Sequence, residues 1–529
     1  MYENFQHWQA TDVIDPMGNK IRNGILGVAA MLALSYAVVW GSASFGKTAE
    51  RVANPTAAHA RISSSQTEPA SAILTALGAK YVLEVRSLGL VVNRDADDEI
   101  WQKIEKRADN FTSILSQNAD DYANSRDLRF SRYEQASGFT FREAAGRAVE
   151  YWPIPAIIWG PPRHPENSYR AAADISGNRQ QAGLGVHLFL WADDANTTDG
   201  AAMIAKVFDF FDRHPDVPAA LIFCEDSDVH RFLVGPKGLS PEGGVVPTVP
   251  DSLVGILVSR SDRVDKLIRP FAVNQSAAVN KETTQYDVTR LWNYYWAQSH
   301  DRTPNGFRAV YMNEMKAQGY EYVSPVNTMR AEWWQRHLPE FWKQISNRGP
   351  GEFKPSPYLP VRWTTWQVAQ FDKAPLIGYL HRPIDVKLTK DDGKPLSQRE
   401  QVAALKAGWQ AAVDTLEPAI APKRVFYDTT SDRRWVIPIT QALLQVGEHA
   451  PDLDDVNQGF DIGRRIANTG VSSPMVQLAL GLIAGYQEGG ASATINLRPN
   501  GDANIIMVSP PDVATKAAWL EQHGGHNPF

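Results

Sequence analysis

The sequence predicts an α/β fold: two α/β domains with mixed, largely parallel sheets behind an N-terminal transmembrane helix. Three observations support this prediction. The chain has 529 residues, which at about 100–200 residues per domain is too long for one compact domain. Strand-like and helix-like segments alternate on both sides of a segment rich in proline and glycine, 346–360. A long apolar run precedes all of these segments.

The apolar run lies between Asn23 and Gly46, where no residue is charged. It is long enough for a membrane-spanning helix, which needs about 20 apolar residues, and longer than the apolar part of a secretory signal. We therefore expect residues 1–46 to be a tail and a retained transmembrane anchor, followed by a flexible linker at 47–70. Two basic residues precede the run and three follow it closely, so charge barely specifies the orientation.

The first α/β domain is predicted at 71–345. A strand, a helix and a strand between residues 185 and 224 make a βαβ crossover, which predicts neighbouring parallel strands. The predicted strands are 80–92, 156–159, 185–191, 219–224 and 252–258, and the predicted helices are 97–115, 199–213 with Asp199 as its N-cap, 262–270, and a polar, aromatic helical region at 286–345.

The second α/β domain is predicted at 361–529, after an interdomain linker at 346–360. Asn-Gly in the turn at 499–502 is a strong signal for a closing hairpin. The two domains share the order of strand and helix, but no residue-level repeat is visible. The predicted strands are 374–380, 424–427 and the hairpin pair 492–497 and 503–508, and the predicted helices are 397–416, 435–448, 456–466 and 475–486.

Gly41–Thr48 (GSASFGKT) matches the pattern of the phosphate-binding loop, in which backbone N–H groups, a lysine and a hydroxyl hold a nucleotide and magnesium. Such a loop follows a strand and opens a helix. Here it follows a run of transmembrane length, and Pro55 would break the helix after it. We therefore favour the exit of a membrane span over a nucleotide site.

Acidic residues follow both strands of the predicted crossover, at 193–194 and 225–228. Ligands of parallel α/β sheets bind at the carboxyl ends of strands, where carboxylates can hold a hard cation or act as general acid and base. Aspartates after strands also cap turns and helices as solvated loop residues, and we favour that interpretation. The residues concerned are Asp193, Asp194, Glu225, Asp226 and Asp228, with His187 on the first strand and His230 after the second.

No motif of a known catalytic class accompanies these carboxylates. The sequence has no G-x-S-x-G elbow, no H-E-x-x-H and no G-x-G-x-x-G after a strand. Its single cysteine, Cys224, excludes an internal disulfide and a thiolate metal cluster, and we expect it to be a small core residue. The formal charge of −6 argues against nucleic-acid binding. We assign no catalytic, cofactor-binding or metal-binding residue from the sequence.

Aromatic residues are dense in the helical region at 286–345. At helical spacing some of them must face a core, and this is the default interpretation for each. Tryptophan and tyrosine are also favoured anchors of protein interfaces, so a partner surface is the second interpretation. The residues are Trp292, Tyr294, Tyr295, Trp296, Trp333, Trp334 and Trp342.

The chain resembles the type VI lipase adapter family. The resemblance rests on the order of four features: the N-terminal apolar run, the block VHLFLWADDANTTDGAAMIAKVFDFFDRHPDVPAALIFCEDSDVHR at Val186–Arg231, HRPIDVKL at His381–Leu388, and ATINLRPNGDANIIMVSPP at Ala493–Pro511. It covers nearly the whole chain beyond the linker. No single short motif is diagnostic.

The resemblance implies a non-enzymatic adapter that binds a phospholipase effector and brings it to the spike protein of a type VI secretion system. It implies no catalytic residue and no cofactor. With the predicted anchor, it places the chain at the bacterial inner membrane, with its soluble part in the cytoplasm. The alternative is a membrane-anchored nucleotide- or metal-dependent enzyme that uses Gly41–Thr48 or the acidic strand ends at 193–194 and 225–228.

Overall fold

The structure is a computed structural model. The described residues, which begin at Tyr81, lie in one compact unit. The anchor predicted at 1–46, the linker predicted at 47–70 and the phosphate-loop match at Gly41–Thr48 lie outside the described residues. Among the helices that are described, none is long and apolar enough to cross a membrane. The structure describes residues 81–529 except 108–110, 164–169, 235–243, 276–284, 304, 318–327, 419 and 448–449, and the side chains of 194, 196 and 315.

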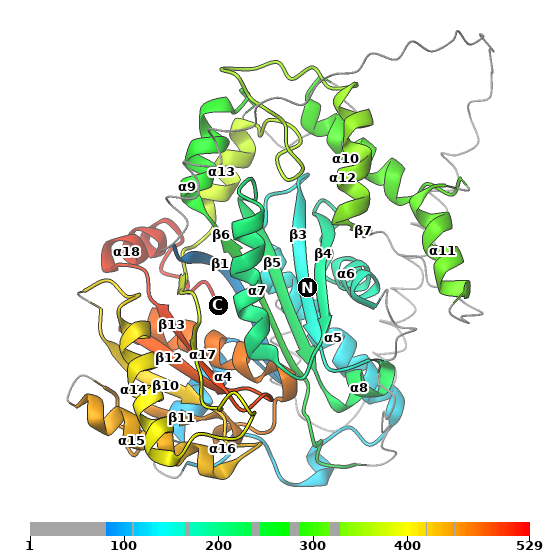
Figure 1. The fold of residues 1–529 in the computed structure, drawn as a ribbon. Coiled ribbons are helices and arrows are strands. Elements are labelled where there is room, and N and C mark those ends of the chain that lie inside the picture. The colour runs from blue at the N-terminus through cyan, green and yellow to red at the C-terminus, as the bar shows by residue number, and fades with distance from the viewer. Residues whose placement is uncertain are drawn as a thin grey trace, which may run out of the picture. The chain divides into compact units, whose positions relative to one another are not determined.

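One mixed sheet runs through this unit (Figure 1). Its strands are β1 (Leu83–Val92), β2 (Asp95–Ala96), β3 (Pro153–Gly160), β4 (Leu188–Asn196), β5 (Ala219–Asp226), β6 (Ser252–Ser259), β7 (Met329–Arg330), β8 (Gly378–Leu380), β9 (Ile384–Val386), β10 (Pro422–Tyr427), β11 (Gly459–Asp461), β12 (Ala491–Leu497) and β13 (Ala503–Ser509). The strand order is β11-β10-β12-β13-β8-β1-β6-β5-β3-β4-β7, with β2 paired to β1 and β9 paired to β13.

The α/β class and the mixed sheet are as predicted, but the strands of the two predicted domains lie in one sheet. The join is β8, which pairs antiparallel with β1 on one side and with β13 on the other. Such a pairing joins residues far apart in the chain and leaves no mark in the local pattern of the sequence. The division at 346–360 into two separately folding domains stays a prediction.

We call residues 81–345 the first half and residues 361–529 the second half. The strands of the two halves have the same topology. In the first half the order β4-β3-β5-β6 is parallel, parallel and antiparallel. In the second half β11-β10-β12-β13 has the same senses. β1 flanks β6 as β8 flanks β13, and β1 and β8 pair antiparallel at the junction. A two-fold relation between the halves gives this arrangement, so the shared rhythm of the sequence reflects a structural repeat.

The helices fill the connections between these strands (Figure 1). In both halves a helix leads into the third strand of this order, α7 before β5 and α17 before β12. The helices are α4 (Asp98–Lys106), α5 (Arg126–Ala145), α6 (Arg170–Gln181), α7 (Gly200–Arg213), α8 (Asp228–Val234), α9 (Ser261–Leu267), α10 (Asp287–Ser299), α11 (Phe307–Ala317), α12 (Ala331–Trp342), α13 (Thr365–Lys373), α14 (Gln398–Val413), α15 (Val436–Val446), α16 (Ile462–Arg465), α17 (Ser473–Glu488) and α18 (Val513–Gln522).

Helix α17 lies at the centre of the unit. It is apolar on all sides, as a helix surrounded by other elements must be, and every residue from Ser473 to Tyr486 is buried. It contacts β12 and β13 of its own half, β6 and β1 of the first half, and α7, its counterpart in the repeat. Gly481 permits this close packing, because a Cβ there would lie about 3.0 Å from the Val508 side chain. The halves therefore share one core around α17.

The outer helices cover the sheet away from α17. Helix α5 packs on β1 and β6, where Gly255 gives it room: a Cβ there would lie 2.5 Å from the Cβ of Ala144. Helices α14 and α15 pack on each other and enclose a separate apolar cluster with β10, β12 and β13, which includes Val402, Trp409 and Ile439. A larger apolar cluster fills the core around α17, and the two clusters together contain most of the buried apolar residues.

Most predicted elements are confirmed with shifted ends. The Asp199 carboxylate accepts the Ala202 N–H at 3.0 Å, which is the predicted N-cap of α7. The closing hairpin is present, with Leu497 opposite Ala503. β4 and β5 are parallel, but the prediction that they are neighbours is wrong, because β3 lies between them. β3 itself begins at Pro153, earlier than predicted.

Three other predictions need correction. In the described residues of 286–345 the helical region consists of the helices α10, α11 and α12, with the short strand β7 before α12. The helix predicted at 456–466 contains the strand β11 and only one helical turn, α16. The helix predicted at 97–115 ends with α4 at Lys106. Strands as short as β7 and β11 have too few residues for a period to be recognised.

Candidate functional site

The acidic positions predicted at the strand ends do not form a single group. β4 continues to Asn196, so Asp193 and Asp194 lie on the strand and not after it, and the side chain of Asp194 is outside the described part. Glu225 and Asp226 are the last residues of β5. Since β3 runs between β4 and β5, the two acidic pairs lie on opposite sides of a strand.

Asp226 joins the two halves of the protein. Its side chain is fully buried and receives two hydrogen bonds from Arg231, at 2.7 and 2.8 Å. Its Oδ2 also accepts the backbone N–H of Val471, at 2.8 Å, from a 3-10 turn of the second half (Gly470–Ser472). The prediction of a solvated loop carboxylate is wrong here. The carboxylate is occupied by protein donors, in a charge-assisted contact.

Asp228 acts as a local cap. Its carboxylate accepts the backbone N–H of Thr248 at 2.7 Å and that of Val249 at 3.2 Å. Its own N–H donates to the carbonyl of Val249 at 2.9 Å. These bonds tie the start of α8 to the segment that leads into β6. The capping interpretation from the sequence therefore fits Asp228, which is half-buried.

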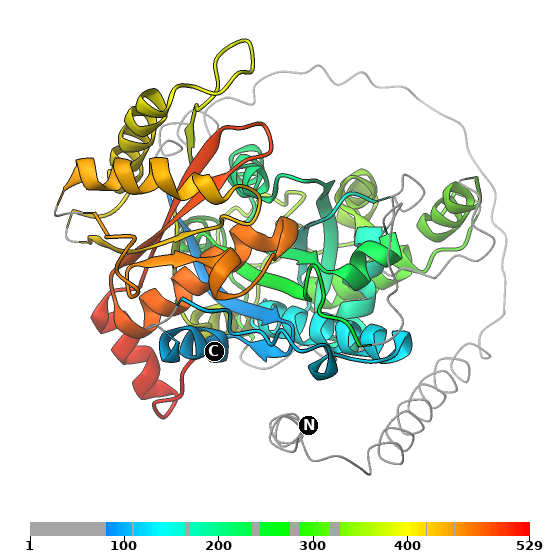
Figure 2. The ribbon, with the colours of Figure 1, turned by 90° about the horizontal axis from the view of Figure 1, so that it is seen from below.

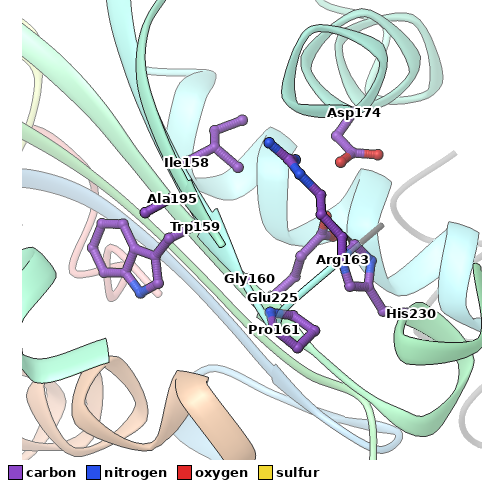
Figure 3. A pocket seen from close by; sticks show the side chains of 9 residues that line it. All are labelled: Ile158, Trp159, Gly160, Pro161, Arg163, Asp174, Ala195, Glu225 and His230. Carbon is purple, nitrogen blue, oxygen red and sulfur yellow. Dashed lines mark ion pairs between the residues drawn. The ribbon is translucent and has the colours of Figure 1, made fainter. Parts of the chain in front are cut away.

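Glu225 belongs to a buried polar network beside the end of β5 (Figure 3). Tyr133 Oη donates to Glu225 Oε2 at 2.7 Å and lies 2.6 Å from His230 Nδ1. Because the tyrosine has one proton, donating it to Glu225 leaves its oxygen to accept from His230 Nδ1–H. Ser137 Oγ also donates to Glu225, at 3.4 Å. Helices α5 and α8 thus position three partners around one carboxylate.

Asp174 extends this network from helix α6. Its carboxyl lies close enough to Glu225 for the two charges to affect each other, and its Oδ1 is 2.7 Å from Arg170 Nε. Burial, followed by the effect of nearby Glu225, raises the pKa of Asp174 to about 7. Burial also raises the pKa of Glu225 and lowers the pKa of His230 to about 4. Near neutral pH the imidazole of His230 is therefore uncharged, and the raised pKa of Asp174 favours its protonated form.

The space next to this network is very small. The cavity has a volume of about 10 Å³, roughly the space that one water molecule needs. Gly160 closes it on one side, where a Cβ would lie 3.3 Å from His230 Nε2. In the described part of the chain, no three His, Cys, Asp or Glu side chains are placed to hold a metal ion. The cavity is lined by Ile158, Trp159, Gly160, Pro161, Arg163, Asp174, Ala195, Glu225 and His230 (Figure 3).

Two further residues named from the sequence have internal partners. His187 precedes β4 instead of lying on it, and its Nε2 donates to the carbonyl of Ala148 at 3.1 Å. Burial lowers the pKa of His187 to about 4, so it is neutral. Cys224 is fully buried, as predicted, and lies 3.3 Å from Ser472 Oγ. Burial raises the pKa of its thiol, which disfavours a reactive thiolate.

The aromatic residues of α10 and α12 are largely core residues. Tyr295 and Trp334 are buried, and the Tyr295 hydroxyl donates to the carbonyl of Phe189 at 2.6 Å. The other five, Trp292, Tyr294, Trp296, Trp333 and Trp342, are half-buried. Arg179 lies 4.6 Å from the centre of the Trp296 ring, and Trp333 stacks on His337. A partner surface over the half-buried rings stays a prediction.

The sequence singled out Glu225 and His230 but missed their partners. Tyr133, Ser137, Arg170 and Asp174 lie on α5 and α6, two helices that the sequence pattern did not reveal. Both helices are polar overall, with small buried faces. The one available signal was the Ser125 N-cap, whose Oγ accepts the Leu128 N–H before α5.

The chain matches two family models along most of the described part. The model for the N-terminal domain of type VI lipase adapter protein Tla3 matches residues 81–244, and the model for its C-terminal domain matches residues 377–510. Together they cover more than half of the chain, and each falls in one half of the sheet.

Several solved structures match this chain at a low level of similarity. A type II polyketide acyl-carrier protein–ketosynthase complex, AntDE:AntF, is 9% identical and covers 82% of this chain and 100% of its own, with a TM-score of 0.39. The 3-oxoacyl-(acyl carrier protein) synthase III of Pseudomonas aeruginosa PAO1 is 11% identical and covers 82% and 99%, with a TM-score of 0.34. At these values the similarity carries no conclusion about activity.

We predict that Asp174→Asn changes how stability depends on pH. The carboxyl of Asp174 has a pKa of about 7 in the fold and about 3.9 when unfolded. The folded state therefore keeps a proton that the unfolded state has lost, and the wild type loses this stabilisation as pH rises from about 4 to about 7. Asparagine does not titrate.

The measurement is thermal melting of both proteins between pH 5 and pH 8. The melting temperature of the wild type minus that of Asp174→Asn should fall by several degrees across this range. Asp391→Asn, in an exposed loop, is the control and should show a constant difference. A difference for Asp174→Asn that is equally constant would contradict the raised pKa.

Proposed function

We propose that this chain, which belongs to the type VI lipase adapter protein family, is a non-catalytic adapter that binds a lipase effector of a type VI secretion system. The observation that carries the proposal is the match of both halves to the two domains of that family. An adapter acts by binding, so it needs a stable scaffold and exposed surfaces and does not need an open catalytic pocket.

The contacts of the acidic residues at the carboxyl end of β5 support a scaffold role for this part of the protein. At the carboxyl end of β5, where α/β enzymes bind their ligands, Asp226 is held by Arg231 and by the Val471 N–H. Glu225 is held in a network beside a cavity of about 10 Å³. These carboxylates have protein partners and lie beside a space for about one water molecule, which fits a role in holding the fold.

Two further parts of the proposal concern the delivery of the effector and the cellular location of the adapter. The adapter would hold a phospholipase effector and help to load it on the spike protein of the secretion system. Its N-terminal run from Asn23 to Gly46 would anchor it to the inner membrane, with the soluble part in the cytoplasm, where effectors are loaded before secretion. Recovery of the native full chain in the soluble fraction, with its N-terminus intact, would contradict the anchor.

We predict that the full chain, tagged at its C-terminus and extracted in mild detergent, co-purifies with a phospholipase effector and with a spike protein. Mass spectrometry identifies both, and an unrelated tagged membrane protein from the same cells is the control. The purified adapter alone should not hydrolyse phospholipid vesicles, whereas the complex should. Phospholipase activity of the adapter alone, or a purification without any lipase, would contradict the adapter role.

A further inference from the structure

A continuous row of aromatic rings lies along helix α10 at the surface of the protein. It runs from Trp366 on α13 over Tyr151 to Trp292 and Trp296 on α10, and ends at His300, the C-cap of that helix. Successive ring centres lie 6.3, 4.9, 5.5 and 5.4 Å apart. We call these five rings the aromatic ladder. Four of the rings are half-buried and His300 is exposed, so each ring packs on the protein and still exposes part of its surface.

The aromatic ladder lies away from the strands that join the two halves. Helix α10 is held to β4 by Tyr295, whose hydroxyl donates to the Phe189 carbonyl. In the order of the sheet, β3, β5, β6 and β1 lie between β4 and the joining strand β8. In Figure 2 the second half, yellow to red, lies on the left, and most of the first half, cyan and green, lies on the right. A partner can therefore bind at the ladder without opening the contacts between the halves.

Tyr151 has a strained backbone within the aromatic ladder. Its φ is +56°, which is a rare value for a bulky aromatic residue. Its N–H donates to the Val186 carbonyl at 2.9 Å, and this bond helps to hold the conformation. The Tyr151 ring lies between those of Trp366 and Trp292. Strained residues of this kind are concentrated at functional sites, and here the strained loop places a ring before any partner binds.

Arg179 adds one positive charge to the aromatic ladder. It lies near the end of α6, and its guanidinium sits over the Trp296 ring, 4.6 Å from the ring centre. Within the part of the chain that the structure describes, this guanidinium has no hydrogen bond and no ion pair. Burial lowers the pKa of Arg179, because water is partly removed from a charge that no carboxylate compensates. A carboxylate from a partner would supply the missing counter-charge.

The side chains of this surface favour a protein as the partner. Tryptophan, tyrosine and arginine are the residues most enriched among those that dominate the binding energy of protein interfaces. The rings offer a large apolar area, and a guanidinium can hold a carboxylate through two parallel hydrogen bonds. An aspartate or glutamate of a partner, with apolar residues beside it, matches the rings and the charge together.

We propose that the aromatic ladder and Arg179 form the docking surface for a segment of the lipase effector in which an acidic residue is flanked by apolar residues. This inference rests on the proposed function, because a lipase is the partner that the name of the family gives. The apolar side chains of the segment would pack on Trp292 and Trp296, and its carboxylate would pair with Arg179. This ion pair would fix the register of the segment on the rings.

The chain offers a clean chemical test, because its single cysteine, Cys224, is fully buried. Ala297 is exposed and follows Trp296 on α10, so Ala297→Cys places a reactive thiol beside the ladder. Ala407→Cys, at an exposed alanine of α14, is the matched control. The probe is the phospholipase effector recovered with the full chain, expressed and purified alone. With a thiol-linked photo-crosslinker, we expect the effector to be captured from position 297 and not from position 407.

Two substitutions measure what the rings and the charge contribute to affinity. Trp296→Ala and Arg179→Gln should each weaken effector binding by at least about tenfold. Arg179→Lys, which keeps the charge, should bind more tightly than Arg179→Gln. The control for the ring is Trp519→Ala, because Trp519 is half-buried on α18 and stacks on His523 as Trp296 stacks on His300. The control for the charge is Arg399→Gln, at an exposed position of α14, and both controls should bind like the wild type.

Thermal melting identifies a variant that has failed to fold, in which case the other variant and the crosslink carry the test. If the wild type binds the effector while Trp296→Ala and Arg179→Gln bind it equally well, the docking surface is wrong. Capture from position 407 but not from position 297 would also contradict it. If the wild type does not bind the effector at all, the proposed function fails first.

Discussion

The contact between Asp226 and the Gly470–Ser472 turn sets how the two halves of the sheet meet. The turn of the second half is placed against the end of β5 so closely that a Cβ on Gly470 would lie 1.9 Å from Asp226 Oδ2. Gly470 has a φ of +59°, a conformation that glycine adopts readily. On its other side the turn abuts Gly200 at the start of α7, where a Cβ would lie 2.0 Å from the Val471 carbonyl oxygen. Gly200, Gly470 and the Asp226 carboxylate therefore set how closely this turn packs against β5 and α7. We call this contact the Asp226 joint.

Other contacts strengthen the joint. Arg498, beside the closing hairpin, donates to Asp199 at 2.9 Å, and Asn504 donates to the carbonyl of Ala201 at 3.1 Å. Both reach the first turn of α7 from the second half. The amino end of α7 and the carboxyl end of β5 are where an α/β enzyme would hold an anion or a catalytic group. In this chain residues of the second half contact both places, at Asp226 and at the first turn of α7.

The sequence predicts the individual helices and strands well, but it does not predict how the strands are ordered and paired in the sheet. Asp199 and the apolar residues at the spacing of a helix identify α7, and Asn-Gly identifies the closing hairpin, because each signal depends on neighbours in the chain. The position of β3 between β4 and β5, and the pairing of β8 with β1, depend on residues far apart and could not be predicted. The same limit applies to the site. Glu225 and His230 were named because they follow a strand, whereas Tyr133 and Asp174 come from helices with small apolar faces.

The central claim is that the Asp226 joint makes the two halves one cooperative unit, and calorimetry of the full chain with Asp226→Ala tests it most directly. The substitution leaves Arg231 and the Val471 N–H without their acceptor, at a cost of about 1–3 kcal/mol. The wild type should unfold the described unit in one transition. The variant should melt several degrees lower or resolve into two transitions, whereas Asp391→Ala, in an exposed loop, should melt like the wild type. An unchanged melting curve for Asp226→Ala would contradict the claim.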